Sequence, residues 1–88
     1  MPQITVYTTA TCPYCHRAKA LLRRKNLAFT EIPVDGDPRA RREMTERAHG
    51  RRSVPQIFFD DVHIGDSDEL HALDRDGKLD ELLDGCVQ

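Results

Sequence analysis

The sequence predicts an α/β fold in which helices flank a four-stranded mixed sheet, in the order β-α-β-α-β-β-α. Two observations predict this fold. A strand-like run at residues 4–8 leads through a Cys-x-x-Cys motif into a segment with helical spacing of apolar residues. Farther along, apolar runs at 54–59 and 62–64 are separated by Asp60-Asp61, which is typical of a hairpin. The length of 88 residues suits one core, so we expect a single domain over residues 1–88.

The first helix is expected from Pro13 to about Lys25. Proline suits the first turn of a helix, because its missing N–H would have no partner there in any case. The apolar face of this helix consists of Ala18, Leu21 and Leu22. A second strand follows around residues 29–34, and a helical crossover of this length makes the two strands parallel neighbours.

Two further helices surround the predicted hairpin. Asp37-Pro38 is typical of an N-cap followed by a first-turn proline, so a helix is expected from there to about Ala48. Asp66 has capping-box spacing to Glu69 and opens a third helix, with Ser67 as the alternative cap. A glycine then ends this helix, and the last apolar residues are expected to form only an amphipathic turn: Leu79, Leu82 and Leu83.

The net charge of −2 hides a cluster of arginines in the middle of the chain. Its members are Arg39, Arg41, Arg42, Arg47, Arg51 and Arg52. Two glutamates interrupt the cluster and few aromatic residues accompany it, so we expect no nucleic-acid binding. A solvated helix face, which also attracts an anionic substrate or partner, is the better interpretation.

The motif Cys12-Pro13-Tyr14-Cys15 lies where the first strand ends and the first helix begins. Unpaired backbone N–H groups at a helix N-terminus stabilise a thiolate, so the sulfur of Cys12 is expected to be reactive. Cys15 lies one helical turn away, close enough to form a disulfide with Cys12. The motif therefore predicts thiol–disulfide oxidoreductase chemistry.

Two other kinds of site share parts of this pattern. Cys-x-x-Cys followed by His16 matches the attachment motif of c-type haem, but we expect no secretory leader and the strand-then-helix setting is that of a redox pair. A zinc site would need further ligands, and none of the four histidines forms a closely spaced second pair. We therefore expect no metal and expect the histidines to be exposed or half-exposed.

Three motifs together carry a resemblance to a known family: Cys12-Pro13-Tyr14-Cys15, residues 53–58 (Ser-Val-Pro-Gln-Ile-Phe) and Gly65-x-Ser67-Asp68. Their order and spacing resemble the glutaredoxin family over nearly the whole chain, and the small bacterial dithiol members most. The resemblance implies a thioredoxin-like fold. It also implies that Cys12 is the nucleophile, that Cys15 resolves mixed disulfides, and that glutathione is the reducing co-substrate.

The resemblance also implies a glutathione site around these motifs. Pro55 is expected to have a cis peptide bond that brings the backbone of Val54 beside the active sulfur, where it pairs with glutathione as an added strand would. Ser67 and Asp68 are expected to hold the γ-glutamyl end at a helix N-terminus. The full set of expected glutathione-binding residues is Tyr14, Ser53, Val54, Pro55, Gly65, Ser67 and Asp68.

Two positions depart from the family pattern. Thr9 stands where a lysine is common, so help for the thiolate is expected from backbone N–H groups or from Arg51 or Arg52. Asp66 stands where a second glycine is usual, which adds a negative charge beside the γ-glutamyl site. Cys86 is expected to be a free surface thiol without a catalytic role.

The expected partners are glutathione and disulfide-containing or glutathionylated proteins. Three cysteines are too few for a secreted disulfide framework, and no stretch is apolar enough to cross a membrane, so we expect a cytoplasmic monomer. Two alternatives remain: an iron–sulfur cluster carrier, in which Cys12 and glutathione bridge a cluster between two copies, and a redoxin reduced by thioredoxin reductase.

Overall fold

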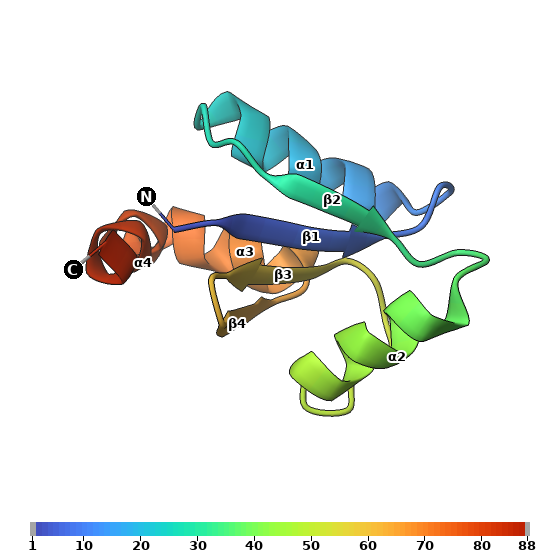
Figure 1. Ribbon diagram of the computed structural model, residues 1–88. Coiled ribbons are helices and arrows are strands. Elements are labelled where there is room, and N and C mark those ends of the chain that lie inside the picture. The colour runs from blue at the N-terminus through green and yellow to red at the C-terminus, as the bar shows by residue number, and fades with distance from the viewer. Residues whose placement is uncertain (1, 88) are drawn as a thin grey trace.

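A computed structural model describes residues 2–87 of the chain, and the side chains of residues 2–83. Helices and strands follow each other in the predicted order, with one helix added at the end (Figure 1). Their bounds are β1 Ile4–Thr8, α1 Pro13–Arg24, β2 Thr30–Pro33, α2 Pro38–Arg47, β3 Gln56–Phe59, β4 Val62–Gly65, α3 Ser67–Arg75 and α4 Lys78–Val87. The predicted α/β fold is confirmed.

The four strands form one mixed sheet in the order β2-β1-β3-β4. β1 and β2 are parallel, as the helical crossover between them predicts, and Thr5 of β1 pairs with Thr30 of β2. β3 runs antiparallel to both β1 and β4, so β3 and β4 form the predicted hairpin. Tyr7 pairs with Gln56, and the end of β1 therefore lies beside the start of β3.

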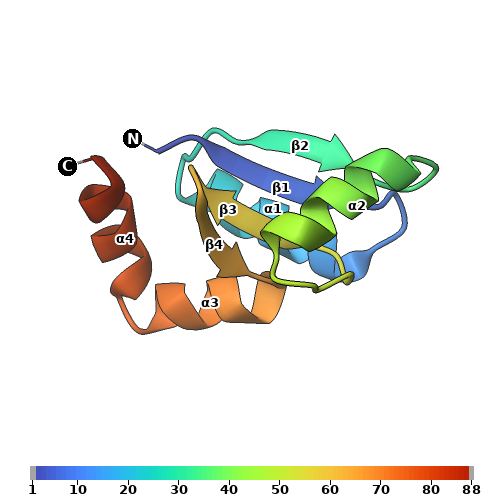
Figure 2. The same cartoon turned by 60° about the horizontal axis from the view of Figure 1, so that its bottom comes forward.

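Side chains of the central strands alternate between two apolar layers, as the period of a strand requires. Ile4 and Val6 face a cluster to which α1, α3 and α4 contribute. Tyr7 of β1 and Phe58 of β3 face the other way and pack with Met44 of α2. Figure 2 shows α2 on one face of the sheet and α1 and α3 on the other. This arrangement of three layers is the expected thioredoxin-like one.

In each of the first three helices, the side chain of the residue just before the helix accepts a backbone N–H from its first turn. Cys12 caps α1, Asp37 caps α2 and Asp66 caps α3. The capping box of Asp66 with Glu69 is present in both directions, so Asp66 and not Ser67 is the cap.

The end of the chain differs from the prediction. Gly77 has a φ of +74° and does separate two helical segments, but the second is the ten-residue helix α4 rather than a single turn. Leu79 and Leu83 are buried against the layer that contains Ala18 and Leu70, and this packing stabilises a full helix. The side chain of Cys86 lies outside the described residues.

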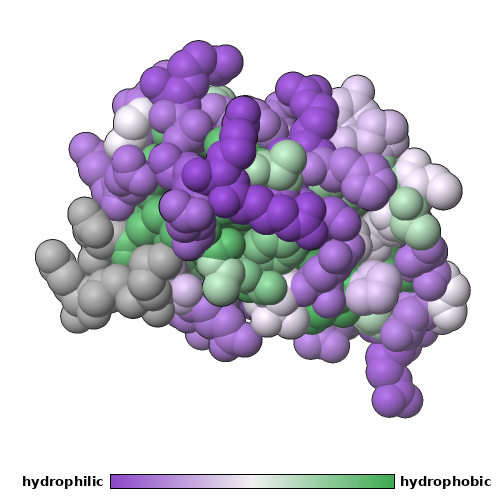
Figure 3. All heavy atoms as spheres, turned by 90° about the horizontal axis from the view of Figure 1, so that it is seen from above, coloured by the Kyte–Doolittle hydropathy of each residue, from purple (hydrophilic) through white to green (hydrophobic). Residues whose placement is uncertain are grey.

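The outer surface of the α1 layer is mainly hydrophilic, with apolar side chains visible between the charged ones (Figure 3).

Among the helices of the described residues, none combines the length and the apolar character that crossing a membrane requires.

Candidate active site

Two contacts hold the sulfur of Cys12 at the start of α1. The backbone N–H of Cys15 donates to Cys12 Sγ over 3.2 Å, so Cys12 is the N-cap of its own helix. The Cys12 thiol also lies 3.7 Å from the carbonyl oxygen of Val54. The sulfur therefore accepts a backbone N–H at the start of α1 and lies at the positive end of the helix dipole.

Cys15 is the second thiol of the motif and is fully buried beneath the first turn of α1. Burial, with the neighbouring Cys12 as the next cause, raises the pKa of Cys15 to about 12. Both cysteines are free thiols. The pair therefore combines a half-exposed sulfur at a helix N-terminus with a buried one that stays protonated at neutral pH.

The loop that carries Cys12 is fixed from the β2 side. The backbone N–H of Ala10 donates to Asp35 Oδ2 over 3.1 Å, and the N–H of Val34 donates to the carbonyl of Thr8 over 2.8 Å. The segment just before α2 therefore lies directly against the segment just before α1.

On the other side, Cys12 faces the segment that leads into β3. The Val54-Pro55 peptide bond is cis, as expected, and Pro55 is buried while Val54 is half-buried. The side chain of Gln56, which is fully buried, donates through Nε2 to the carbonyl and hydroxyl oxygens of Ser53 at 3.0 and 3.3 Å. Gln56 Oε1 lies 2.6 Å from Nε2 of His63 on β4. The loop beside the thiol is thus anchored through Gln56 to the outer strand.

The N-terminus of α3 has its own polar network. Asp66 Oδ1 accepts the N–H of Glu69, and Glu69 Oε1 accepts the N–H of Asp66. Arg51 bridges both carboxylates, with Nη2 3.1 Å from Asp66 and Nη1 2.7 Å from Glu69. The charge that Asp66 adds at this position is therefore paired, and the pKa of Glu69 is lowered, since hydrogen bonds from Arg51 and Asp66 outweigh the effect of burial.

The predicted γ-glutamyl residues lie next to this network. Gly65 has a φ of +124°, a conformation that glycine adopts readily and other residues rarely do. Ser67 is buried, with its hydroxyl 3.4 Å from Nδ1 of His71. Asp68 is exposed and its carboxylate has no hydrogen-bond partner among the described side chains. Asp66 therefore caps α3, and Asp68 is the aspartate whose carboxylate stays available to a ligand among the described residues.

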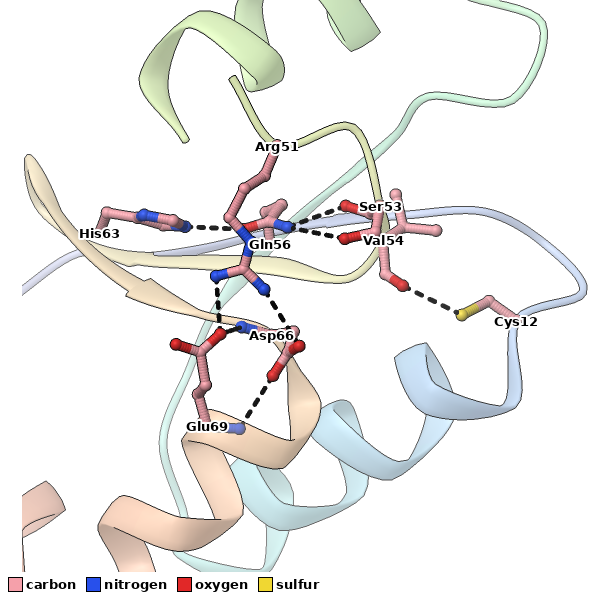
Figure 4. A network of polar contacts seen from close by, with 8 residues as sticks. All are labelled: Cys12, Arg51, Ser53, Val54, Gln56, His63, Asp66 and Glu69. Carbon is pink, nitrogen blue, oxygen red and sulfur yellow. Dashed lines mark hydrogen bonds and ion pairs between the residues drawn. The ribbon is translucent and has the colours of Figure 1, made fainter. Parts of the chain in front are cut away.

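The polar contacts of this region fall into two groups joined by one segment (Figure 4). Cys12 and Val54 meet at one end, and Asp66 and Glu69 lie at the other, with residues 51–56 running between them. Tyr14 is 54% exposed beside the thiols. Arg51 is directed toward the start of α3, so its charge is engaged there and not at Cys12.

Sequence reasoning missed Gln56 and His63 as members of this region. A glutamine inside an otherwise apolar run was the available signal, because a buried amide needs hydrogen-bond partners. All four histidines are exposed or half-buried, as expected. Within the described residues there is no group of three or more histidine, cysteine or acidic side chains that could hold a metal ion.

A thioredoxin-like sheet with a Cys-x-x-Cys pair at the first strand-to-helix junction defines a thiol–disulfide oxidoreductase. Comparison with known proteins narrows this class. The glutaredoxin family profile matches residues 4–64. The chain is 57% identical over 81 residues to a probable glutaredoxin of Synechocystis, with 92% of each chain covered. It is 55% identical over 83 residues to glutaredoxin 3 of Escherichia coli, covering 94% of this chain and 99% of the relative.

A solved structure is similar over the same range. The crystal structure of a buckwheat glutaredoxin–glutathione complex matches with a TM-score of 0.83 and 29% identity, covering 97% of this chain and 79% of the other. The chain belongs to the glutaredoxin family.

Proposed function

We propose that this protein is a glutathione-dependent oxidoreductase that reduces glutathione mixed disulfides and protein disulfides. The observation that carries the proposal is the position of Cys12 Sγ, between the N–H of Cys15 at 3.2 Å and the carbonyl of Val54 at 3.7 Å. The first contact favours a thiolate nucleophile. The second brings a strand-like backbone segment beside the reacting sulfur, where it can pair with the backbone of a bound peptide such as glutathione.

In the proposed reaction, the Cys12 thiolate attacks the glutathione sulfur of a mixed disulfide. A bond forms between Cys12 and glutathione, the substrate sulfur leaves as a thiolate, and that thiolate takes up a proton. A second glutathione thiolate then attacks the glutathione sulfur on Cys12. Glutathione disulfide is released and the Cys12 thiolate is restored.

The reduction of a protein disulfide has a different second step. After Cys12 has formed a mixed disulfide with the substrate, Cys15 attacks the Cys12 sulfur, a Cys12–Cys15 disulfide forms and the second substrate sulfur is released. Two glutathione molecules then reduce this disulfide in successive exchanges and leave as glutathione disulfide. Burial raises the pKa of Cys15, so its thiol gives up its proton as it attacks, and the departing substrate thiolate is the acceptor. Cys15 is thus suited to act as a resolving thiol only once a disulfide is present beside it.

The proposed glutathione site extends from Cys12 along the backbone of Val54 to the start of α3. Tyr14 and Ser53 flank it, Pro55 shapes the turn at Val54, and Gly65 leads to the helix N-terminus. There the N–H of Ser67 donates to the γ-glutamyl carboxylate, and the Asp68 carboxylate accepts a hydrogen bond from the γ-glutamyl ammonium. Three observations support this placement: the Asp68 carboxylate has no partner among the described residues, the charge of Asp66 is paired, and the buckwheat relative forms a complex with glutathione. We also propose that the chain is one domain and acts as a monomer in the cytoplasm.

A coupled assay tests the proposal. The protein is mixed with glutathione, glutathione reductase, NADPH and the mixed disulfide of glutathione with β-mercaptoethanol. We expect NADPH oxidation that depends on both glutathione and the protein, and none with Cys12→Ser. Turnover with thioredoxin reductase, but not with glutathione, would contradict the proposal.

A further inference from the structure

The surface of α2 carries positive charge that the proposed reaction does not use. Residues 38–52 contain six arginines and two glutamates, so this stretch has a charge of +4 while the rest of the chain has −6. Two of the arginines are engaged elsewhere. Arg51 pairs with Asp66 and Glu69, and Arg47 lies over the ring of Phe58.

Three of the remaining four arginines line an open groove of about 360 Å³, which we call the arginine groove. Its lining consists of Pro38, Arg41, Arg42, Thr45, Glu46 and Arg52. Arg41, Arg42 and Arg52 are exposed, and none of them forms an ion pair with another residue in the described part of the chain. Glu46 is the one carboxylate in the lining, so the groove keeps an excess of two positive charges.

The segments before and after α2 connect the arginine groove to the reactive thiol. At one end of α2, Asp35 binds the N–H of Ala10 in the loop that carries Cys12. At the other end, Arg52 is two residues before Val54, whose carbonyl contacts Cys12 Sγ. Both segments that flank α2 therefore reach the same loop, and Figure 2 shows α2 lying across the sheet face between them.

We propose that the arginine groove docks an acidic stretch of polypeptide next to the cysteine of a protein substrate. Guanidinium groups bind carboxylates through paired hydrogen bonds, and arginine clusters are a common means of recognising acidic motifs. A protein segment that presents a disulfide to Cys12 must continue past this thiol, and the neighbouring arginines favour carboxylates along that path. The inference rests on the proposed function, because it selects among the substrates of the same thiol.

Exposed charge pairs contribute mainly to the rate of encounter and are screened by salt. The inference therefore predicts a preference in kcat/KM that depends on the charge of the substrate and on ionic strength. The expected preference of the wild-type protein for an acidic over a basic peptide is about fivefold to tenfold at low salt, falling below about twofold in ~0.5 M NaCl.

The test uses two eleven-residue peptides, each with one central cysteine in a mixed disulfide with glutathione. One peptide has four aspartates around the cysteine and the other has four lysines. Wild-type protein is compared with Arg41→Gln/Arg42→Gln, and with Arg24→Gln/Arg75→Gln, which removes the same charge from exposed positions on α1 and α3. We expect the preference to be lost in the first variant and kept in the second.

A charge reversal completes the test. Arg41→Glu/Arg42→Glu should favour the lysine peptide, which a loss of folding could not produce. Equal wild-type turnover of both peptides at low salt would overturn the inference while leaving the proposed function intact. An equal rise of the glutathione KM on both peptides in Arg41→Gln/Arg42→Gln would also overturn it, because the groove would then serve glutathione. Turnover of neither peptide by wild-type protein would instead overturn the proposed function.

Discussion

Nε2 of His63 lies 2.6 Å from Oε1 of Gln56, so that the edge strand β4 is joined to the first residue of β3. The amide of Gln56 uses its Nε2 to donate to Ser53, so its oxygen is left to accept, and His63 must carry a proton on Nε2. The imidazole also stacks on the ring of Phe58, with centroids 5.0 Å apart. A side chain on β4 thereby fixes the loop that ends beside Cys12.

His63 predicts a pH dependence of stability. Burial lowers the pKa of His63, and the charges of Arg51 and His49 act in the same direction, while Glu69 and Asp66 oppose them. Because the folded pKa lies below the ordinary value near 6.5, the unfolded chain binds the proton more readily. The contribution of His63 to stability is therefore present above about pH 6.5 and is lost as the pH falls through the lower folded value.

Urea unfolding at pH 7.5 and pH 5.5 checks this prediction. We expect His63→Asn to reduce the loss of stability between these two pH values, and His16→Gln, at an exposed position on α1, to leave it unchanged. The same loss in wild-type protein and in His63→Asn would show that other groups cause it.

The two cysteines of the motif should differ in reactivity toward alkylating agents. Because the pKa of Cys15 is about 12, only about one molecule in ten thousand carries its thiolate at pH 8, and the thiol is buried as well. In a Cys86→Ser background, iodoacetamide at pH 8 should modify Cys12 alone. Mass spectrometry of the digested protein locates the adduct, and unfolding in urea should make both cysteines reactive. Rapid modification of Cys15 in the folded protein would contradict the burial on which its assigned role depends.

Substitution of each thiol separates the two proposed steps. Cys12→Ser should abolish all turnover, because a hydroxyl is not ionised at neutral pH. Cys15→Ser should keep activity on glutathionylated substrates, in which free glutathione completes the cycle, and lose most activity on protein disulfides. The comparison requires both substrate classes, assayed with the same coupled oxidation of NADPH. Equal loss by both variants on a glutathionylated substrate would exclude this division of roles.

The sequence predicted these elements well because local signals agree with the packing. Pro13 and Asp37-Pro38 mark helix starts that the structure has, and the alternation of Ile4 and Val6 with Tyr7 separates the two apolar layers. The length of α4 could not be predicted in this way, because it depends on Leu79 and Leu83 packing against residues of α1 and α3 far along the chain.

The sequence predicted those site residues whose role follows from a motif. It did not predict those whose role depends on contacts between distant parts of the chain. Cys12, Cys15 and Val54 meet as their motifs suggest. The pairing of Arg51 with Asp66 joins residues fifteen positions apart, and the bond from His63 to Gln56 crosses between strands. No local pattern indicates either contact, since each depends on how the hairpin and α3 are placed.

Of the two aspartates at the start of α3, only Asp66 should lower stability when it is removed. Asp66 accepts the N–H of Glu69 and pairs with Arg51, so Asp66→Ala should lower the free energy of unfolding by about 0.5–2 kcal/mol, as the loss of an N-cap does. Asp68 is exposed and makes no such bond among the described residues, so Asp68→Ala should leave stability within about 0.5 kcal/mol of wild type.

The glutathione KM should change more in Asp68→Ala than in Asp66→Ala. If Asp68 binds the γ-glutamyl ammonium, its removal costs a charge-assisted hydrogen bond of about 1.5–3 kcal/mol, which raises the glutathione KM about tenfold or more. Asp66→Ala should change that KM less, because Arg51 already neutralises the Asp66 carboxylate. Urea unfolding and the coupled assay, run on both variants and on Asp61→Ala as an exposed control, measure the two effects separately. An unchanged KM in Asp68→Ala would leave the ammonium without its proposed partner, and would move the γ-glutamyl site away from the start of α3.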